Sequence, residues 1–312
     1  MITVNQFSDE RLGACVEVTN GKITAKATLD VGPRIFYFAA NGGNNVFFED
    51  VNDTGNANEQ QALSQEVYGD RGVWHLYGGH RLWASPESAP RTIYPDNQPV
   101  ACEMTGRGVK LTAQKQVWTN LQMEMEIVMY DNSNTLDVYH RIQNQGAWDI
   151  KFAPWCLSVM AGGGVEIMPL PDAQTGLLPN HWLALWPYCK MNDPRVTFGE
   201  AFITLAQDTA CSHPFKLGLK SQHGWAAYYN AGTLFVKYFD PKYAQGNFPD
   251  GGMNYETYTN NVMVEMESLG EYQLIAPGGV SEVKETWKVI DGLKKPDFSD
   301  AGLQAFRAAY IQ

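Results

Sequence analysis

The chain has 312 residues, 44% of them hydrophobic, and carries a formal net charge of −11 at neutral pH. This is enough apolar material for one large core or two ordinary domains. The acidic charge argues against a nucleic-acid backbone or an anionic membrane surface as a partner, because no basic field attracts either. The five cysteines lack Cys-x-x-Cys spacing and no signal sequence or apolar run of about 18 residues is present, so we expect a cytoplasmic protein without disulfides, zinc or a membrane span.

The first distinctive segment is residues 74–88, with the sequence WHLYGGHRLWASPES. Its Gly-Gly pair marks a bend or a close backbone approach, and the proline-rich residues 85–99 predict an irregular loop. Aromatic faces beside an arginine suit a sugar, because sugar C–H faces stack on rings while the hydroxyls need fixed polar partners. The alternative is that the aromatic residues fill the core and that His75 and His80 are ordinary hydrogen-bonded histidines.

Alternating apolar and polar residues predict β-strands along most of the chain. Residues 122–130 (QMEMEIVMY) place three methionines and an isoleucine on one face, and a glutamine and two glutamates on the other. Residues 135–144, 232–239 and 261–268 show similar patterns, and segments rich in Asn, Gly, Asp and Pro separate the strands. The sequence therefore predicts an all-β protein with one face of each strand buried.

The C-terminal residues 298–312 (FSDAGLQAFRAAYIQ) form the one predicted helix, with Ser299 or Asp300 as its N-cap. The chain contains no repeat, low-complexity tract or long linker. We therefore expect a single domain that spans residues 1–312.

Several motifs together resemble the galactose mutarotase, or aldose 1-epimerase, superfamily over most of the chain. They are DVGPRIFYF (30–38), YGGHRLW (77–83), YPDN (94–97), VYHRIQNQG (138–146), FPDGGMNYETYT (248–259), VEMESLGEYQLIAPGG (264–279) and VKETWKV (283–289). The resemblance is to an uncharacterised branch of this superfamily. It implies a β-supersandwich of two large antiparallel sheets and a cofactor-free isomerase that interconverts sugar anomers. A carboxylate would act as general base at the anomeric hydroxyl and a histidine as general acid toward the ring oxygen.

The resemblance assigns the general base to Glu265, which stands in the family's context on a late strand (VMVEMES). Glu267 lies two residues on and therefore on the same face, and Glu256 is the other nearby acid. A carboxylate against apolar neighbours has a raised pKa and is a better base than a surface glutamate. The alternative is that Glu265 and Glu267 are solvated surface charges.

The general acid is harder to place, because the position of the family's second histidine is occupied by FAPWCLSV (152–159). We assign the role to His80, with His75 in reserve, and interpret His140 as a core residue. Arg81 resembles the family's sugar-binding arginine. The further substrate-binding candidates are His75, Trp83, Asp96, Asn97, Glu256 and Glu267.

We expect a small sugar or sugar derivative as the partner, with no metal, cofactor, nucleic acid or membrane. Two other functions stay open: a non-catalytic carbohydrate-binding or sensing module, and a glycoside hydrolase or lyase that uses two of the carboxyl groups. If His80 and Arg81 face a ligand outside the core, replacing either by alanine changes stability by no more than about 1 kcal/mol.

Overall fold

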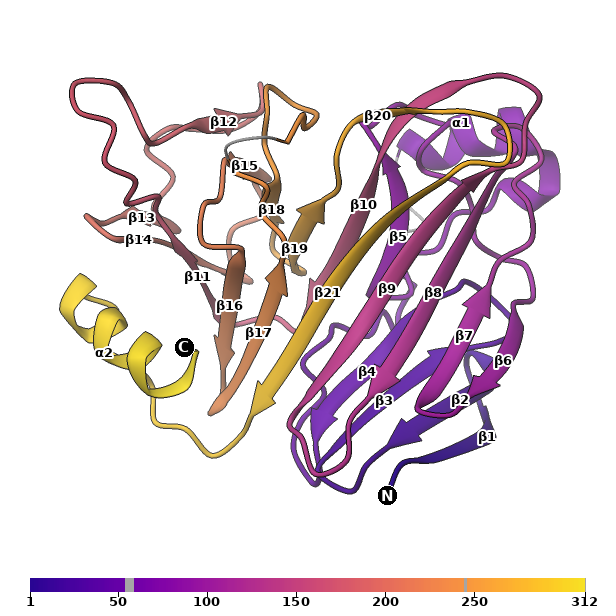
Figure 1. Ribbon diagram of the computed structural model, residues 1–312, viewed down its shortest axis with the longest axis horizontal. Coiled ribbons are helices and arrows are strands. Elements are labelled where there is room, and N and C mark those ends of the chain that lie inside the picture. Colours follow the sequence, from indigo (N-terminus) through magenta and orange to yellow (C-terminus); the bar gives the residue numbers. More distant parts are fainter. Residues whose placement is uncertain (54–58, 244–245, 312) are drawn as a thin grey trace.

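The computed structural model describes residues 1–53, 59–243 and 246–311. Its strands form two large antiparallel sheets (Figure 1), which confirms the predicted all-β supersandwich. No helix in the described residues is long and apolar enough to cross a membrane.

The first sheet contains eleven strands within the described residues. In spatial order they are β1 (Thr3–Asp9), β2 (Gly13–Thr19), β3 (Ile23–Thr28), β4 (Ile35–Ala40), β5 (Gly79–Ser85), β10 (Ile150–Met160), β19 (Val264–Leu269), β18 (Tyr255–Thr259), β15 (Phe215–Leu219) and β12 (Leu183–Leu185), while β20 (Gln273–Ile275) pairs with β10 beside this path. Strands far apart in the sequence therefore become neighbours at β5, β10 and β19.

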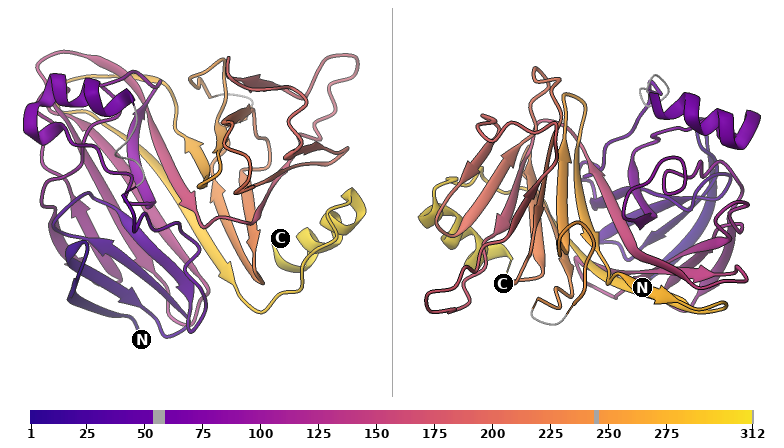
Figure 2. Two further views of the ribbon diagram at one scale, coloured as in Figure 1. Left: turned by 180° about the vertical axis from the view of Figure 1, so that it is seen from behind. Right: turned by 90° about the horizontal axis from the view of Figure 1, so that it is seen from above.

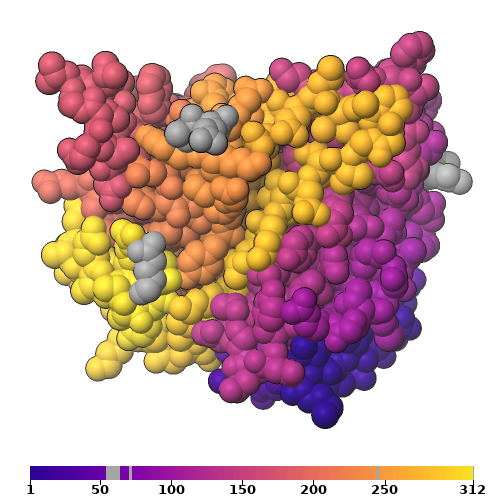
Figure 3. Space-filling model, in the orientation of Figure 1, coloured from indigo at the N-terminus to yellow at the C-terminus, as the bar shows by residue number. Residues whose placement is uncertain are grey.

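The second sheet contains ten strands within the same described part of the chain. In order they are β13 (Val196–Phe198), β14 (Phe202–Ala206), β11 (Val165–Pro169), β16 (Trp225–Asn230), β17 (Thr233–Phe239), β21 (Val280–Ile290), β9 (Thr135–Asn144), β8 (Leu121–Met129), β7 (Gly108–Thr112) and β6 (Ala101–Thr105). The long β21 pairs with β17 on one side and with β9 on the other. The gold residues around it form a band across the space-filling view (Figure 3).

The main core lies between the two sheets. Phe38 from the first sheet contacts Phe235 and Trp287 from the second, with ring centroids 6.1 and 5.7 Å apart. The alternation predicted for residues 122–130 is confirmed, because Met123, Met125, Ile127 and Met129 are all buried in this core. Burying these aliphatic and aromatic side chains is the main force that holds the sheets together.

The two α-helices of the described residues lie at opposite ends of the molecule (Figures 1 and 2). The predicted C-terminal helix is confirmed as α2 (Asp300–Tyr310): the side chain of Ser299 caps it, and Leu303 and Phe306 are buried. The expectation of a single helix was wrong, because α1 (Glu59–Tyr68) and a 3-10 helix (Gly69–Gly72) precede β5. The sequence of α1, EQQALSQEVY, lacks a continuous apolar stripe that would indicate a helix.

Candidate active site

Strand alternation places two different sets of side chains on the two faces of the first sheet. In β5, Leu82 belongs to the core between the sheets, whereas Trp83 packs with Trp155 and Leu157 of β10 on the opposite face. In β19, Met266 points into the same core, so Glu265 and Glu267 are on the opposite face with Trp83. This second face of the sheet is the floor of the candidate site.

The Gly-Gly pair that precedes β5 is required by close backbone packing. Gly78 and Gly79 have φ angles of 86° and 72°, which L-residues with side chains rarely adopt. A Cβ atom on Gly78 would lie 2.0 Å from the carbonyl oxygen of Phe48, and one on Gly79 would lie 2.5 Å from that of Ile35. The predicted close backbone approach is confirmed.

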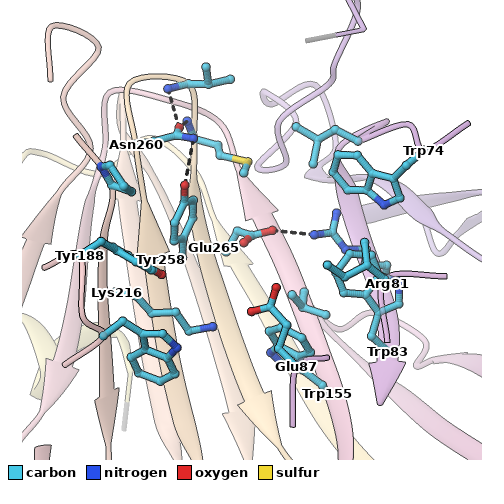
Figure 4. A pocket seen from close by; sticks show the side chains of 17 residues that line it. Trp74, Arg81, Trp83, Glu87, Trp155, Tyr188, Lys216, Tyr258, Asn260 and Glu265 are labelled. Carbon is cyan, nitrogen blue, oxygen red and sulfur yellow. Dashed lines mark hydrogen bonds and ion pairs between the residues drawn. The ribbon is translucent and has the colours of Figure 1, made fainter. Parts of the chain in front are cut away.

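A cavity of about 460 Å³ opens on this face of the sheet (Figure 4). Its lining combines aromatic rings with a few charged groups: Trp74, Arg81, Trp83, Glu87, Trp155, Trp186, Tyr188, Lys216, Tyr258, Asn260 and Glu265, with Leu76, Ile93, Leu157, Pro214, Val262 and Met263. Apolar walls with a small number of convergent polar groups are typical of small-molecule sites.

Glu265 and Arg81 form a buried ion pair in the centre of this cavity (Figure 4). Arg81 Nη2 donates to Glu265 Oε1 at 2.9 Å, and the two side chains are 3% and 9% exposed. Burial raises the pKa of Glu265 to about 7, although Arg81 opposes this shift. The alternative of a solvated surface charge is therefore wrong for Glu265, which can exchange a proton near neutral pH.

Lys216 links two further carboxylates on the same face. Its Nζ atom lies 2.9 Å from Glu256 Oε2 and 2.8 Å from Glu267 Oε2, and Glu267 Oε2 also accepts a hydrogen bond from Trp155 Nε1 at 2.7 Å. Burial raises the pKa of Glu256 to about 8; Lys216 opposes this shift and Glu267 adds to it. Because two carboxylates share one ammonium group, only one is fully compensated at neutral pH.

Several buried polar atoms on this face have no hydrogen-bond partner within the described residues. They are Arg81 Nε and Nη1, Trp83 Nε1, Glu256 Oε1 and Glu267 Oε1. Buried polar groups in proteins are nearly always satisfied, so such a concentration of donors and acceptors is typical of a site that is completed by a polar ligand.

His80 lies outside this cavity. It faces the core between the sheets and is 0% exposed, with Nδ1 2.8 Å from Ser158 Oγ and Nε2 2.7 Å from His140 Nε2. Burial and the neighbouring His140 hold the pKa of His80 well below its usual range. Residues 80 and 81 are neighbours in a strand and therefore point to opposite faces, so a general-acid role for His80 does not fit its position.

The expectation that His80 stands outside the core was wrong, whereas Arg81 is buried in the cavity on the opposite face of the sheet. His140 and Glu285 complete the cluster around His80, and their ligand atoms lie within 4.8 Å of one another. Glu285 Oε1 already lies 3.0 Å from Lys237 Nζ, and its Oε2 accepts from Trp287 Nε1 at 2.7 Å. The ammonium group of Lys237 beside Glu285 would repel a metal ion. We therefore interpret the cluster as a structural polar network.

The remaining candidates are dispersed. His75 contacts Asp53 through Nδ1 at 2.9 Å and lies beside Tyr77, away from the cavity lining. Asp96 pairs with Arg34 Nη2 at 2.8 Å, and the Asn97 side chain accepts a hydrogen bond from Tyr77 Oη at 2.9 Å. Asp96 and Asn97 therefore hold the loop against the sheet instead of lining the cavity.

Sequence reasoning missed several residues of the cavity. Lys216, Trp155 and Trp186 come from strands or loops 70 or more residues after β5, and their convergence depends on strand order. Glu87 stood in the first segment singled out from the sequence, yet no role was assigned to it. Its carboxyl projects into the cavity, and exclusion of bulk water raises its pKa above the usual range.

No protein-family model matches the chain, and no curated protein matches it. Solved structures with a similar fold include a Klebsiella pneumoniae protein provisionally described as an aldose 1-epimerase, with a TM-score of 0.63, 10% identity and coverage of 99% of this chain and 86% of that one. A galactose mutarotase-like protein from Clostridium acetobutylicum has a TM-score of 0.54 and 10% identity, with coverage of 93% and 99%.

A TPR-domain containing protein from Parabacteroides distasonis has a TM-score of 0.61 and 14% identity over 91% of this chain. The match covers 49% of that protein, so the chain spans about half its length. At these identities the comparisons confirm the resemblance to galactose mutarotase-like proteins at the level of the fold.

Proposed function

We propose that this protein interconverts the anomers of a sugar bound in the cavity of about 460 Å³, with Glu265 as the general base. The observation that carries the proposal is a buried carboxyl group that ionises near neutral pH, held at 2.9 Å by Arg81 between aromatic walls. The galactose mutarotase-like fold supports the same function.

The chemistry requires one proton to leave and one to arrive. Ionised Glu265 accepts the proton of the anomeric hydroxyl, the bond between the anomeric carbon and the ring oxygen breaks, and the ring oxygen takes up a proton. The open-chain aldehyde then rotates and closes in the reverse sequence on its other face. Arg81 holds Glu265 in place and favours its ionised form, while Trp83 and Trp155 line the cavity and offer apolar contact to the sugar.

Glu87 is the proton donor in this proposal. No histidine is among the residues that line the cavity in the described part of the chain. Glu87 extends into the cavity from the loop after β5, and partial desolvation raises its pKa above the ordinary value although the residue stays exposed at the mouth of the cavity. A carboxyl group that keeps its proton to higher pH is better suited to act as a general acid.

The test is the rate of mutarotation of neutral, amino and acidic aldoses, followed by polarimetry or NMR exchange. We expect Glu265→Gln to lower the rate by roughly 10²- to 10⁴-fold while sugar binding survives, because glutamine keeps the shape and removes only the basicity. The matched control is Glu10→Gln, the same change at an exposed turn, which should behave as wild type.

Equal rates above background for wild type and Glu265→Gln would remove Glu265 from the mechanism. Background rates in both proteins with saturable binding would favour a carbohydrate-binding or sensing module, which the absence of a histidine from the described lining makes the second candidate. Cleavage of glycosides in place of anomer exchange would favour a hydrolase or lyase.

A further inference from the structure

A second, smaller cavity of about 300 Å³ adjoins the first. It is lined by Ser85, Glu87, Ala89, Trp155, Trp186, Lys216, Asp250 and Glu256. Four of these residues, Glu87, Trp155, Trp186 and Lys216, also line the larger cavity. One ligand can therefore extend from Glu265 into the smaller cavity.

The smaller cavity has an excess of negative charge. Asp250 and Glu256 line it, and Glu267 forms an ion pair with Lys216 at 2.8 Å. Lys216 is the one cation among the described residues that line the smaller cavity. Leaving Glu87 aside, the three carboxyl groups of Asp250, Glu256 and Glu267 face a single ammonium group. An added anion would be repelled here, whereas an added cation would be stabilised.

Glu256 provides an open contact point within this cavity. Its side chain is only 2% exposed and its Oε2 atom binds Lys216, but Oε1 has no hydrogen-bond partner among the described residues. A buried carboxylate oxygen without a donor is unfavourable by itself. A ligand that brings a donor, and positive charge with it, would satisfy that atom.

The surrounding side chains already hold one ammonium group in this way. Lys216 Nζ lies 4.8 Å from the ring centres of both Trp155 and Trp186, and its charge contacts Glu256 and Glu267. Indole faces together with carboxylates are suited to alkylammonium groups. A metal ion is a poorer occupant, because the described acidic and histidine ligands form a metal-type group only at His80, His140 and Glu285.

We propose that the smaller cavity binds a protonated amino group, so that the sugar in the larger cavity is an amine-bearing sugar. This inference rests on the proposed function for the position of the sugar ring, and it adds the chemical class of the substrate. Acidic and phosphorylated sugars are disfavoured for the same electrostatic reason.

When an ammonium group binds, Glu256 should release its proton, and the groups that face Glu256 determine this release. These are Lys216 on β15, Glu267 on β19, Asp250 on the segment before β18, and Glu87 on the loop after β5. Burial raises the pKa of Glu256 to about 8, so this carboxyl group holds a proton over part of the neutral range. An incoming ammonium group lowers that pKa and expels the proton.

The test is isothermal titration calorimetry with 6-amino-6-deoxyglucose, glucosamine, glucose and glucuronic acid as probes. We expect at least one amino sugar to bind wild type about tenfold or more tightly than glucose, with glucuronic acid weakest. Titrations in buffers of different ionisation enthalpy should show net proton release for the amino sugar and none for glucose.

Two variants test the assignment to the smaller cavity. Glu256→Gln should remove most of the roughly tenfold preference for the amino sugar and the proton release while glucose binding is retained. Asp250→Asn should weaken the preference less, since Asp250 is only partly buried, and this variant tests the idea even if Glu256→Gln fails to fold. Glu10→Gln is the control for the change in net charge.

Equal affinity for glucose and both amino sugars, tighter binding of glucuronic acid, or no binding of any amino sugar would overturn the inference. So would an amine preference that both variants retain. An amine preference without mutarotation would contradict the proposed function alone, whereas mutarotation without an amine preference would contradict this inference alone.

Discussion

Glu256 should make the folded protein less stable as the pH rises. Its side chain is buried, and it shares the ammonium group of Lys216 with Glu267. Burial raises its pKa from the ordinary value of 4.5 to about 8, so the folded state binds this proton more tightly than the unfolded state. The resulting stability is complete below about pH 4.5 and is lost as the pH rises through about 8.

The size of the effect follows from the pKa difference. Each pKa unit corresponds to about 1.4 kcal/mol, so a shift from 4.5 to about 8 gives an upper limit of about 5 kcal/mol. Glu256→Gln cannot titrate and leaves Lys216 paired with Glu267. Between about pH 5 and about pH 9, wild type should therefore lose several kcal/mol of its free energy of unfolding that Glu256→Gln does not lose. This difference cannot exceed the limit of about 5 kcal/mol.

The assay is urea denaturation followed by tryptophan fluorescence at a series of pH values. Glu10→Gln is the control, and its pH dependence should follow that of wild type. If the curves of wild type and Glu256→Gln run parallel, Glu256 ionises in the folded protein as it does in the unfolded chain. Glu256 would then lack the raised pKa that its burial beside Glu267 implies.

Three other outcomes follow from the structure. Arg81→Met should lower the free energy of unfolding, measured by urea denaturation, by about 3 to 5 kcal/mol because it leaves the buried Glu265 without its cation. Adding Glu265→Gln should recover part of this loss, and strictly additive effects of the two changes would contradict the ion pair. His80→Ala should cost roughly 2 to 5 kcal/mol with little change in sugar binding per folded molecule, whereas loss of binding at full stability would return His80 to the site. Dialysis against a chelator should leave the thermal transition unchanged despite the proximity of His80, His140 and Glu285, and a lowered transition would reveal a metal there.

Patterns that are local in the sequence predicted much of the fold. The alternation of residues 122–130 predicted which side chains of β8 are buried, and Ser299 followed by a periodic apolar segment predicted α2. Both depend on neighbours within a few residues, and the side-chain periods of 2.0 and 3.6 make such patterns visible. The polar helix α1 left no comparable signal.

The candidate site depended on contacts that are not local. Glu265 and Arg81 are 184 residues apart and meet because β10 lies between their strands. The sequence does not reveal that β15 and β18 pair and bring Lys216 to Glu256. The error over His80 was different in kind: His80 and Arg81 were both expected to face a ligand, although alternation in β5 places neighbouring residues on opposite faces.

The pH dependence of kcat/KM for mutarotation tests the central claim most directly, because it measures the ionisation of the base in the free protein. Glu265 acts as a base only when ionised, so its pKa of about 7 predicts a rate that rises through neutral pH, and Glu265→Gln should lose this rise. A profile that is flat through neutral pH, or a rise that persists in Glu265→Gln, would show that Glu265 is not the base.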